Sequence, residues 1–187
     1  MTDREIEMRL RAELPPELFE HVLRTRVTAV EIAGLCGVDP TACDLAALLH
    51  DCCRHLPESL LLNLAGEFNI FVSDAEKDKP VLLHGPVGAE VARERFGITD
   101  GEVLDAVRYH TTGRAGMSFV EQVVYLADKM EPGKRRTSLP VSGRSGLRPA
   151  ILDHVNRMII RWVKNGLPIH PSSIEMRNWL LEARVED

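Results

Sequence analysis

The sequence lacks three patterns that would place the protein in a specialised class. Its four cysteines, at positions 36, 43, 52 and 53, form no C-x-x-C pair, so the usual zinc-ribbon and thioredoxin-like motifs are absent. No stretch approaches the roughly 18 apolar residues that a membrane span needs. The charged start, MTDREIEMRLRAELPPE, has no apolar segment typical of a signal peptide. We therefore expect a reduced, soluble, cytoplasmic protein that binds no membrane.

Acidic residues are missing from one segment of a chain that is acidic overall. The net charge is −5 over 187 residues, which argues against binding of nucleic acid through bulk charge. Between positions 132 and 152, however, there is no acid, and the cations there are Lys134, Arg135, Arg136, Arg144 and Arg148. This segment is either a solvated basic loop or a clamp for an anionic substrate.

Alternating runs of β-branched residues are also scarce, whereas signals for helix starts and stops recur. Apolar residues with helical spacing follow Asp39-Pro40 and Pro149, and Ser118 with Glu121 has the spacing of a capping box. We expect helices over about 16–37, 39–54, 86–97, 100–110, 118–132 and 149–166, with two more starting at 57 and 171. A chain of this length, with 44% hydrophobic residues, suits one domain with a real core. The sequence therefore predicts a single all-α domain.

A set of histidines and aspartates falls at the ends of apolar helical runs. The set comprises His21, the adjacent pair His50-Asp51, His84, His110 and Asp128. A carboxylate that follows an apolar run such as 45–49 is costly to bury without a partner, and a cation would supply one. Imidazole and carboxylate ligands without thiolate suit iron, manganese or zinc. Taken singly, each histidine could instead be a helix cap and each aspartate the partner of an arginine.

The order and context of these residues resemble the HD superfamily of metal-dependent phosphohydrolases. More narrowly, they resemble the YqeK-type bacterial enzymes that hydrolyse diadenosine tetraphosphate symmetrically. The matching stretches cover about 19–178 and read AALLHDCCRHLP, LLHGPVGAEVA, VRYHTTGRAGMS, VVYLADKMEPGK and GLPIHPSSIEMRN. The resemblance implies an HD-domain helical bundle over 18–187, preceded by an N-terminal extension over 1–17. It also implies a symmetrical bis(5'-nucleosyl)-tetraphosphatase that forms two ADP by attack of a metal-activated water.

Carried over residue by residue, the resemblance implies a metal site and catalytic groups. The primary site would be formed by His21, His50, Asp51 and Asp128. His84 and His110 would face the same cavity and either hold a second metal or bind a phosphate, and with Asp51 they would be the catalytic residues. The implied cofactor is one or two divalent ions, with iron first and manganese or zinc as alternatives. The implied partner is a small nucleotide, with no nucleic acid and no membrane.

Further residues would handle the polyphosphate. Besides the two histidines of the cavity, the resemblance points to Arg24, Arg54, Lys134, Arg135, His170 and Arg177. Arg54 stands where the family usually has lysine, and Lys134 where it more often has arginine, which changes the geometry of the phosphate contacts. The segment around His170 has a purely structural alternative, as the start of a helix with proline at its first position.

Other interpretations remain open from the sequence. The protein could be another HD-type phosphohydrolase, acting on a mononucleotide, a deoxynucleoside triphosphate or a cyclic dinucleotide, or a nucleotide-sensing module without turnover. The metal, the preference among dinucleoside polyphosphates and the oligomeric state, a homodimer included, are left undecided. His55 and His154 match no ligand position. We expect Trp162 and Trp179 to lie in the core.

Overall fold

The computed structural model describes residues 1–134 and 141–182, with the side chain of Lys134 left out. Within these ranges every regular element is a helix, which confirms the all-α prediction. The α-helices are α1 (Asp3–Glu13), α2 (Pro16–Cys36), α3 (Pro40–Leu49), α4 (Glu58–Glu67), α5 (Asp74–Asp78), α6 (His84–Phe96), α7 (Gly101–Tyr109), α8 (Phe119–Met130), α9 (Leu147–Lys164) and α10 (Pro171–Glu182). Short 3₁₀ turns are η1 (Pro80–Leu83), η2 (Pro132–Lys134) and η3 (Arg144–Gly146).

Side-chain caps fix several helix starts where the sequence places them. Asp39 accepts a hydrogen bond from the backbone N–H of Thr41 at the start of α3, and Asp100 accepts from the first turn of α7. Ser118 and Glu121 form the predicted capping box of α8. Such caps satisfy backbone N–H groups that have no partner inside the helix.

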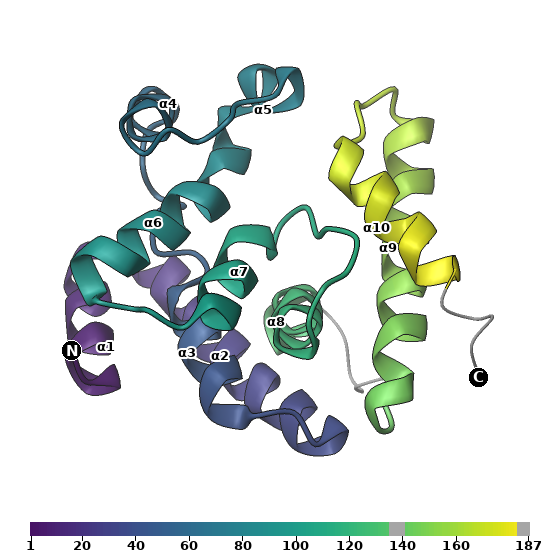
Figure 1. The fold of residues 1–187 in the computed structure, drawn as a ribbon, viewed down its shortest axis with the longest axis horizontal. Coiled ribbons are helices and arrows are strands. Elements are labelled where there is room, and N and C mark those ends of the chain that lie inside the picture. The colour runs from purple at the N-terminus through teal and green to yellow at the C-terminus, as the bar shows by residue number, and fades with distance from the viewer. Residues whose placement is uncertain (135–140, 183–187) are drawn as a thin grey trace.

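Helix α8 lies at the centre of the molecule, with α2, α3 and α7 around it (Figure 1). Its side chains Val123, Val124, Tyr125 and Leu126 are all 0% exposed. Four consecutive residues point to nearly all sides of a helix, so this middle part of α8 is surrounded by protein. Asp128, near the end of α8, therefore lies in the interior as part of this buried helix.

The chain departs from the predicted helix directly after α3. We expected this helix to run to about Arg54, but it ends at Leu49. The N–H of Cys52 donates to Leu49 O at 3.0 Å, and that of Arg54 donates to Asp51 O at 3.1 Å. These bonds span three residues instead of four, so the chain tightens into a turn. Asp51, in this turn, is 1% exposed and faces the histidines at the centre.

The N-terminal segment is also more ordered than a simple extension. A capping box between Thr2 and Glu5 starts α1. Ile6 and Leu10 on this helix are 0% and 1% exposed and belong to the core. The domain boundary at residue 18 stays a prediction.

Helices α9 and α10 stand together on one side of the molecule, facing α7 and α8 (Figure 1). Of the basic segment that we expected to be a loop, 135–140 lies outside the described residues, and the remainder includes η2 and η3. Helix α9 begins at Leu147, two residues before the proline that we took as its start. In the described part of the chain, no helix combines the length and the apolar character that crossing a membrane demands.

Candidate metal centre

Three of the histidines share one local arrangement, since each directly follows the last residue of a helix. His50 follows α3, His84 follows η1 and His110 follows α7. In each ring, Nδ1 contacts the backbone carbonyl three residues earlier: Ala47 O at 2.7 Å, Val107 O at 2.7 Å and, for His84, Val81 O. A carbonyl only accepts, so Nδ1 carries the proton. In the neutral ring, Nε2 is then left as an unprotonated lone pair.

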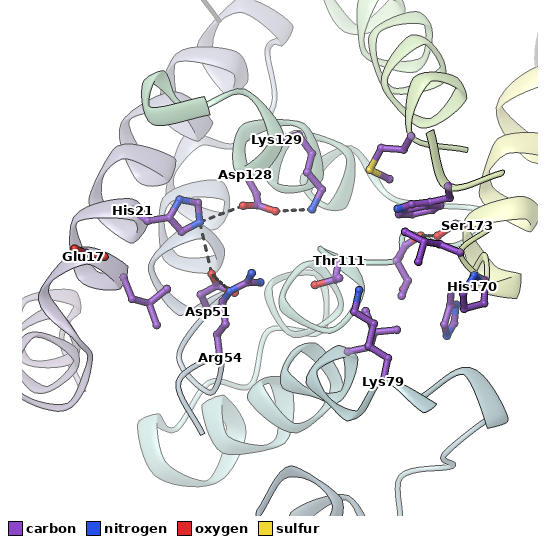
Figure 2. Close-up of a pocket in the computed structure, with 17 residues that line it drawn as sticks. Glu17, His21, Asp51, Arg54, Lys79, Thr111, Asp128, Lys129, His170 and Ser173 are labelled. Carbon is purple, nitrogen blue, oxygen red and sulfur yellow. Dashed lines mark hydrogen bonds and ion pairs between the residues drawn. The ribbon is translucent and has the colours of Figure 1, made fainter. Parts of the chain in front are cut away.

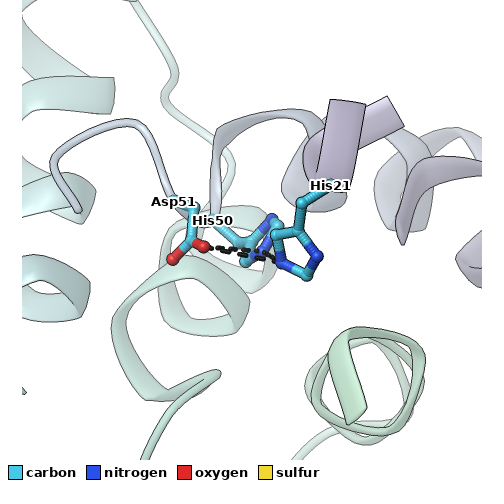
Figure 3. A group of neighbouring side chains, drawn as sticks. All are labelled: His21, His50 and Asp51. Atoms are coloured by element: carbon cyan, nitrogen blue, oxygen red, sulfur yellow. Dashed lines mark hydrogen bonds and ion pairs between the residues drawn. The ribbon is translucent and has the colours of Figure 1, made fainter. Parts of the chain in front are cut away.

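These lone pairs converge on one another and on a carboxylate. His50 Nε2 lies 3.2 Å from His21 Nε2, and His84 Nε2 lies 3.0 Å from His110 Nε2. Asp51 joins the two pairs. Its Oδ2 is 3.5 Å from the Nε2 atoms of His21 and His50, while its Oδ1 is 3.2 Å from His84 Nε2 and 3.4 Å from His110 Nε2. Figure 3 shows the first group, which has the spacing of a metal site.

A second carboxylate completes the cluster from α8. Asp128 Oδ1 lies 3.1 Å from His21 Nε2 and 3.9 Å from His50 Nε2. Its other oxygen accepts a hydrogen bond from Lys129 Nζ at 2.5 Å. The structure thus brings together all six of the histidines and aspartates singled out in the sequence.

The protonation states of these groups are those that a divalent cation requires. Burial lowers the pKa of His50 to about 4 and also lowers the pKa of His110, so both rings are neutral near pH 7. Burial alone would raise the pKa of Asp51, but as the pH falls the imidazoles facing its carboxylate take up protons first, and their charge holds that pKa well below its usual range. Neutral imidazoles and ionised carboxylates are metal ligands.

Without a cation, the acceptor atoms of the cluster cannot all be satisfied by hydrogen bonds within the protein. Facing lone pairs 3.0–3.2 Å apart repel each other, and the hydroxyl of Thr111, 3.1 Å from His84 Nε2 and 2.9 Å from His110 Nε2, has one proton for two acceptors. Asp51 Oδ1 is buried and has no hydrogen-bond partner. Buried polar atoms are normally satisfied. The donor set therefore fits a metal at His21, His50, Asp51 and Asp128, and a second at Asp51, His84 and His110.

Glu131, at the end of α8, is a residue of the site that our sequence analysis missed. Its buried carboxylate accepts from His21 Nδ1 at 3.3 Å, from Arg24 Nε at 2.6 Å and from the N–H of Gly133 at 2.8 Å. These contacts lower the pKa of Glu131 against the effect of its burial. The proton on His21 Nδ1 leaves its Nε2 free to bind a metal. The sequence contained a pattern that could have placed Glu131 in the site, because it lies three residues after Asp128 on the same helical face.

A cavity of about 600 Å³ opens beside the cluster (Figure 2). At one end it is bounded by His21, Asp51 and Asp128, and Arg54 lies near them. The other end is formed by α9, α10 and the chain between them. Lys79 and Thr111 lie between the two ends in Figure 2. The side chains at the far end are Met158, Trp162, Leu167, Pro168, His170 and Ser173.

Only some of the predicted substrate-binding residues line the cavity. Arg54 and His170 line the cavity. Arg24 does not line it and is paired with Glu131. Arg177 lines a separate hollow and donates to Asn156 Oδ1 at 2.6 Å. Arg135 and the side chain of Lys134 fall outside the described residues.

The lining residues that we had not assigned to the cavity include two lysines and a tryptophan. Lys79 and Lys129 place cations along the wall, and Trp162 contributes to the far end. Trp162 is a correction, because we expected it in the core. Its helical spacing is that of a core residue, and periodicity does not tell whether an apolar side chain meets protein or a cavity. Trp179, in contrast, packs against the core.

Comparison with known proteins identifies the family of this chain. The family model described as HD domain matches residues 18–133. A relative from Halalkalibacterium halodurans, named bis(5'-nucleosyl)-tetraphosphatase, symmetrical, is 31% identical over 92% of this chain and 93% of its own. A relative from Bacillus subtilis with the same name is 27% identical over 92% and 94%. A crystal structure from Clostridium acetobutylicum, described as a predicted HD superfamily hydrolase involved in NAD metabolism, is 29% identical and superposes with a TM-score of 0.90 over 98% of both chains. This chain therefore belongs to the HD-domain family of hydrolases.

Proposed function

We propose that this protein is a symmetrical bis(5'-nucleosyl)-tetraphosphatase that hydrolyses diadenosine tetraphosphate to two ADP. Relatives with that name match the chain over more than nine-tenths of its length. The observation that carries the proposal is the cluster of unprotonated imidazoles and ionised carboxylates at one end of the cavity. Such a centre, with cations along the adjoining wall, suits hydrolysis of a phosphoanhydride.

The metal would be held by the chain's own histidines and aspartates. His21, His50, Asp51 and Asp128 form the primary site, and Asp51, His84 and His110 can form a second. We propose iron, which accepts this mixture of nitrogen and oxygen ligands. A bound divalent cation lowers the pKa of a coordinated water enough to provide a nucleophile near neutral pH and neutralises charge on the phosphate.

The remaining residues bind and orient the substrate. Arg54, with its side chain 49% exposed and its Nε 3.6 Å from Asp51 Oδ2, offers a guanidinium at the entrance to the centre. A guanidinium can grip a phosphate with two hydrogen bonds. Lys79 adds a cation further along the cavity. His84 and His110 are buried behind the residues that line the cavity, and burial lowers the pKa of His110, so of their two predicted roles we propose ligation of a second metal.

The test is to separate the nucleotides formed from diadenosine tetraphosphate by chromatography. ADP should be the sole product of the wild-type protein. Asp51→Asn should retain neither bound metal, measured by elemental analysis, nor turnover, because Asp51 belongs to both groups of ligands. Asp74→Asn is the matched control, since that side chain is 95% exposed on α5 and should leave both unchanged. Formation of AMP and ATP would overturn the symmetrical assignment.

A further inference from the structure

The cavity changes character along its length, from a charged end at the metal centre to an apolar end on α9. Met158 and Trp162 come from α9, and Leu167 and Pro168 from the chain that follows it. We propose that this apolar end holds one nucleobase of the substrate by stacking on Trp162, and that the enzyme therefore distinguishes weakly between bases. This inference rests on the proposed function and adds to it a specificity-determining residue.

The packing of α9 explains why Trp162 is available to a ligand. Ile151, Val155, Met158 and Trp162 form one stripe at helical spacing. The first two are 0% exposed, and the other buried residues of α9, Leu147, Ala150 and Leu152, also precede Met158. From Met158 onward the stripe meets the cavity instead. The stripe is therefore buried in the core in the first half of α9. In the second half it exposes the thioether of Met158 and the indole of Trp162 to a ligand in the cavity.

The polar side chains at this end are turned toward the protein, and their donors are bonded within it or buried. Ser173 Oγ donates to Thr112 O at 2.8 Å. His170 Nδ1 accepts from the N–H of Ser172 at 3.2 Å, and its buried Nε2 lies 3.7 Å from Glu76 Oε1. His170 Nε2 makes no hydrogen bond but is buried, and the hydroxyl protons of Thr112 and Ser173 are used within the protein, so among the described side chains lining this end we find no accessible donor for the edge of a base. Stacking tolerates any base, since every base has a π-face, whereas a site that hydrogen-bonds its ligand rejects analogues strongly.

The distance between the two ends would be spanned by phosphates. Lys79 and Thr111 lie between the metal centre and His170 (Figure 2). No carboxylate of the described residues forms an ion pair with Lys79, so its charge is available to a phosphate. A volume of about 600 Å³ is that of a pocket for one small ligand. We therefore place one nucleoside diphosphate half in this cavity, with its phosphates at the metal centre and its base against Trp162.

Fluorescence distinguishes the two tryptophans of the chain. Trp179→Phe retains Trp162 as its single fluorophore, whereas Trp162→Phe retains Trp179, which packs against the core. Titrating both metal-loaded variants with ADP should quench Trp162 and leave Trp179 unchanged. Unchanged emission of Trp162 at ADP concentrations that inhibit the enzyme would overturn the inference.

Kinetics test the same contact independently. Trp162→Ala should raise the KM for diadenosine tetraphosphate by about tenfold and change kcat by less than about threefold, as expected for the loss of one stacking contact. Trp162→Phe should retain a near wild-type KM because it keeps an aromatic face. A fall in kcat with an unchanged KM in Trp162→Ala would contradict a base-binding role.

Base selectivity is the third readout. The kcat/KM values for diadenosine and diguanosine tetraphosphate should agree within about tenfold, because stacking alone separates bases weakly. A preference beyond about a thousandfold would show that a hydrogen-bonding contact reads the base, and would overturn the inference while leaving the hydrolase assignment intact. If neither compound were cleaved, the proposed function would fail, and the ADP titration of Trp162 would still decide the base site.

Discussion

At the scale of single residues, the metal centre depends on where each imidazole carries its proton. Backbone carbonyls hold the proton of His50, His84 and His110 on Nδ1, and Glu131 does the same for His21. All four Nε2 atoms are thereby turned toward Asp51 as lone pairs. The three carbonyl contacts are local, across three residues, whereas the contact of Glu131 joins α2 to the end of α8.

Glu131→Gln should weaken metal binding without removing a ligand. The amide keeps the size of the side chain but loses the charge that orients His21 and neutralises Arg24. Loss of such a partner typically costs about 10- to 100-fold in metal affinity. Competition with a chelator of known affinity measures the change. Glu121→Gln offers no suitable control because it caps α8, so the exposed Glu58→Gln is the better comparison. Equal affinity in Glu131→Gln and the wild-type protein would remove Glu131 from the site.

Lys79→Ala should raise the KM for diadenosine tetraphosphate and leave kcat nearly unchanged. Lys79 lines the cavity away from the metal ligands, so its charge should act on binding. A hydrogen bond to a charged group contributes about 1.5–3 kcal/mol, which corresponds to a KM increase of about tenfold or more. Lys77→Ala is a matched control, because Lys77 lies two residues away, pairs with Asp74 and does not line the cavity. The same KM in both variants would argue against a phosphate contact.

At the scale of the elements, the two glycines of the stretch HGPVG allow α6 to approach α7 and the turn after α3 closely. A Cβ on Gly85 would lie 2.7 Å from the backbone oxygen of Arg108, and one on Gly88 would lie 3.3 Å from Cys52 Sγ. The first contact is with backbone, which has little freedom to move. This close approach sets His84 beside His110, 3.0 Å apart at their Nε2 atoms.

Gly85→Ala should therefore separate α6 from α7 and disturb the second group of ligands. We expect a loss of stability of about 1–3 kcal/mol, the usual cost of overpacking, together with reduced turnover. Thermal unfolding and activity assays measure the two effects. Gly66→Ala in α4 is the control, since its Cβ would meet nothing within 4 Å and alanine favours the helix. Wild-type stability and activity in Gly85→Ala would mean that the close approach of α6 to α7 is not required.

The elements also show which features the sequence was able to predict. The caps at Asp39, Asp100 and Ser118 were readable because they depend on residues within a few positions of one another. The tight turn after Leu49 was not, because the local pattern allowed the helix to continue. The same limit applies to Trp162, whose spacing is that of a core residue although it faces the cavity.

At the scale of the whole molecule, the metal centre joins segments that are far apart in the chain. Its ligands come from α2, from the turn after α3, from the boundary of η1 and α6, from the end of α7 and from α8. The resemblance in the sequence identified this set because the order of the residues is distinctive. Their mutual distances follow from the packing of α2, α3 and α7 around α8 and of α6 on α7.

A cation bound across these segments should stabilise the folded state, because the unfolded chain has no such site. Removing metal with a chelator should lower Tm. At a free metal concentration of 100 times the Kd, the stabilisation lost would be about 2.7 kcal/mol. Differential scanning calorimetry measures the shift. In Asp51→Asn the chelator should change Tm little, and an equal shift in that variant would place the stabilising metal elsewhere.

The central claim is that this HD centre cleaves diadenosine tetraphosphate at its middle phosphoanhydride with water as the nucleophile. The most direct measurement is the mass spectrum of the nucleotides formed by metal-loaded protein in ¹⁸O-labelled water. Attack on an inner phosphorus predicts ADP as the sole product, with one ¹⁸O in the terminal phosphate of one of the two ADP molecules. AMP and ATP as products, or ADP without label, would contradict the account.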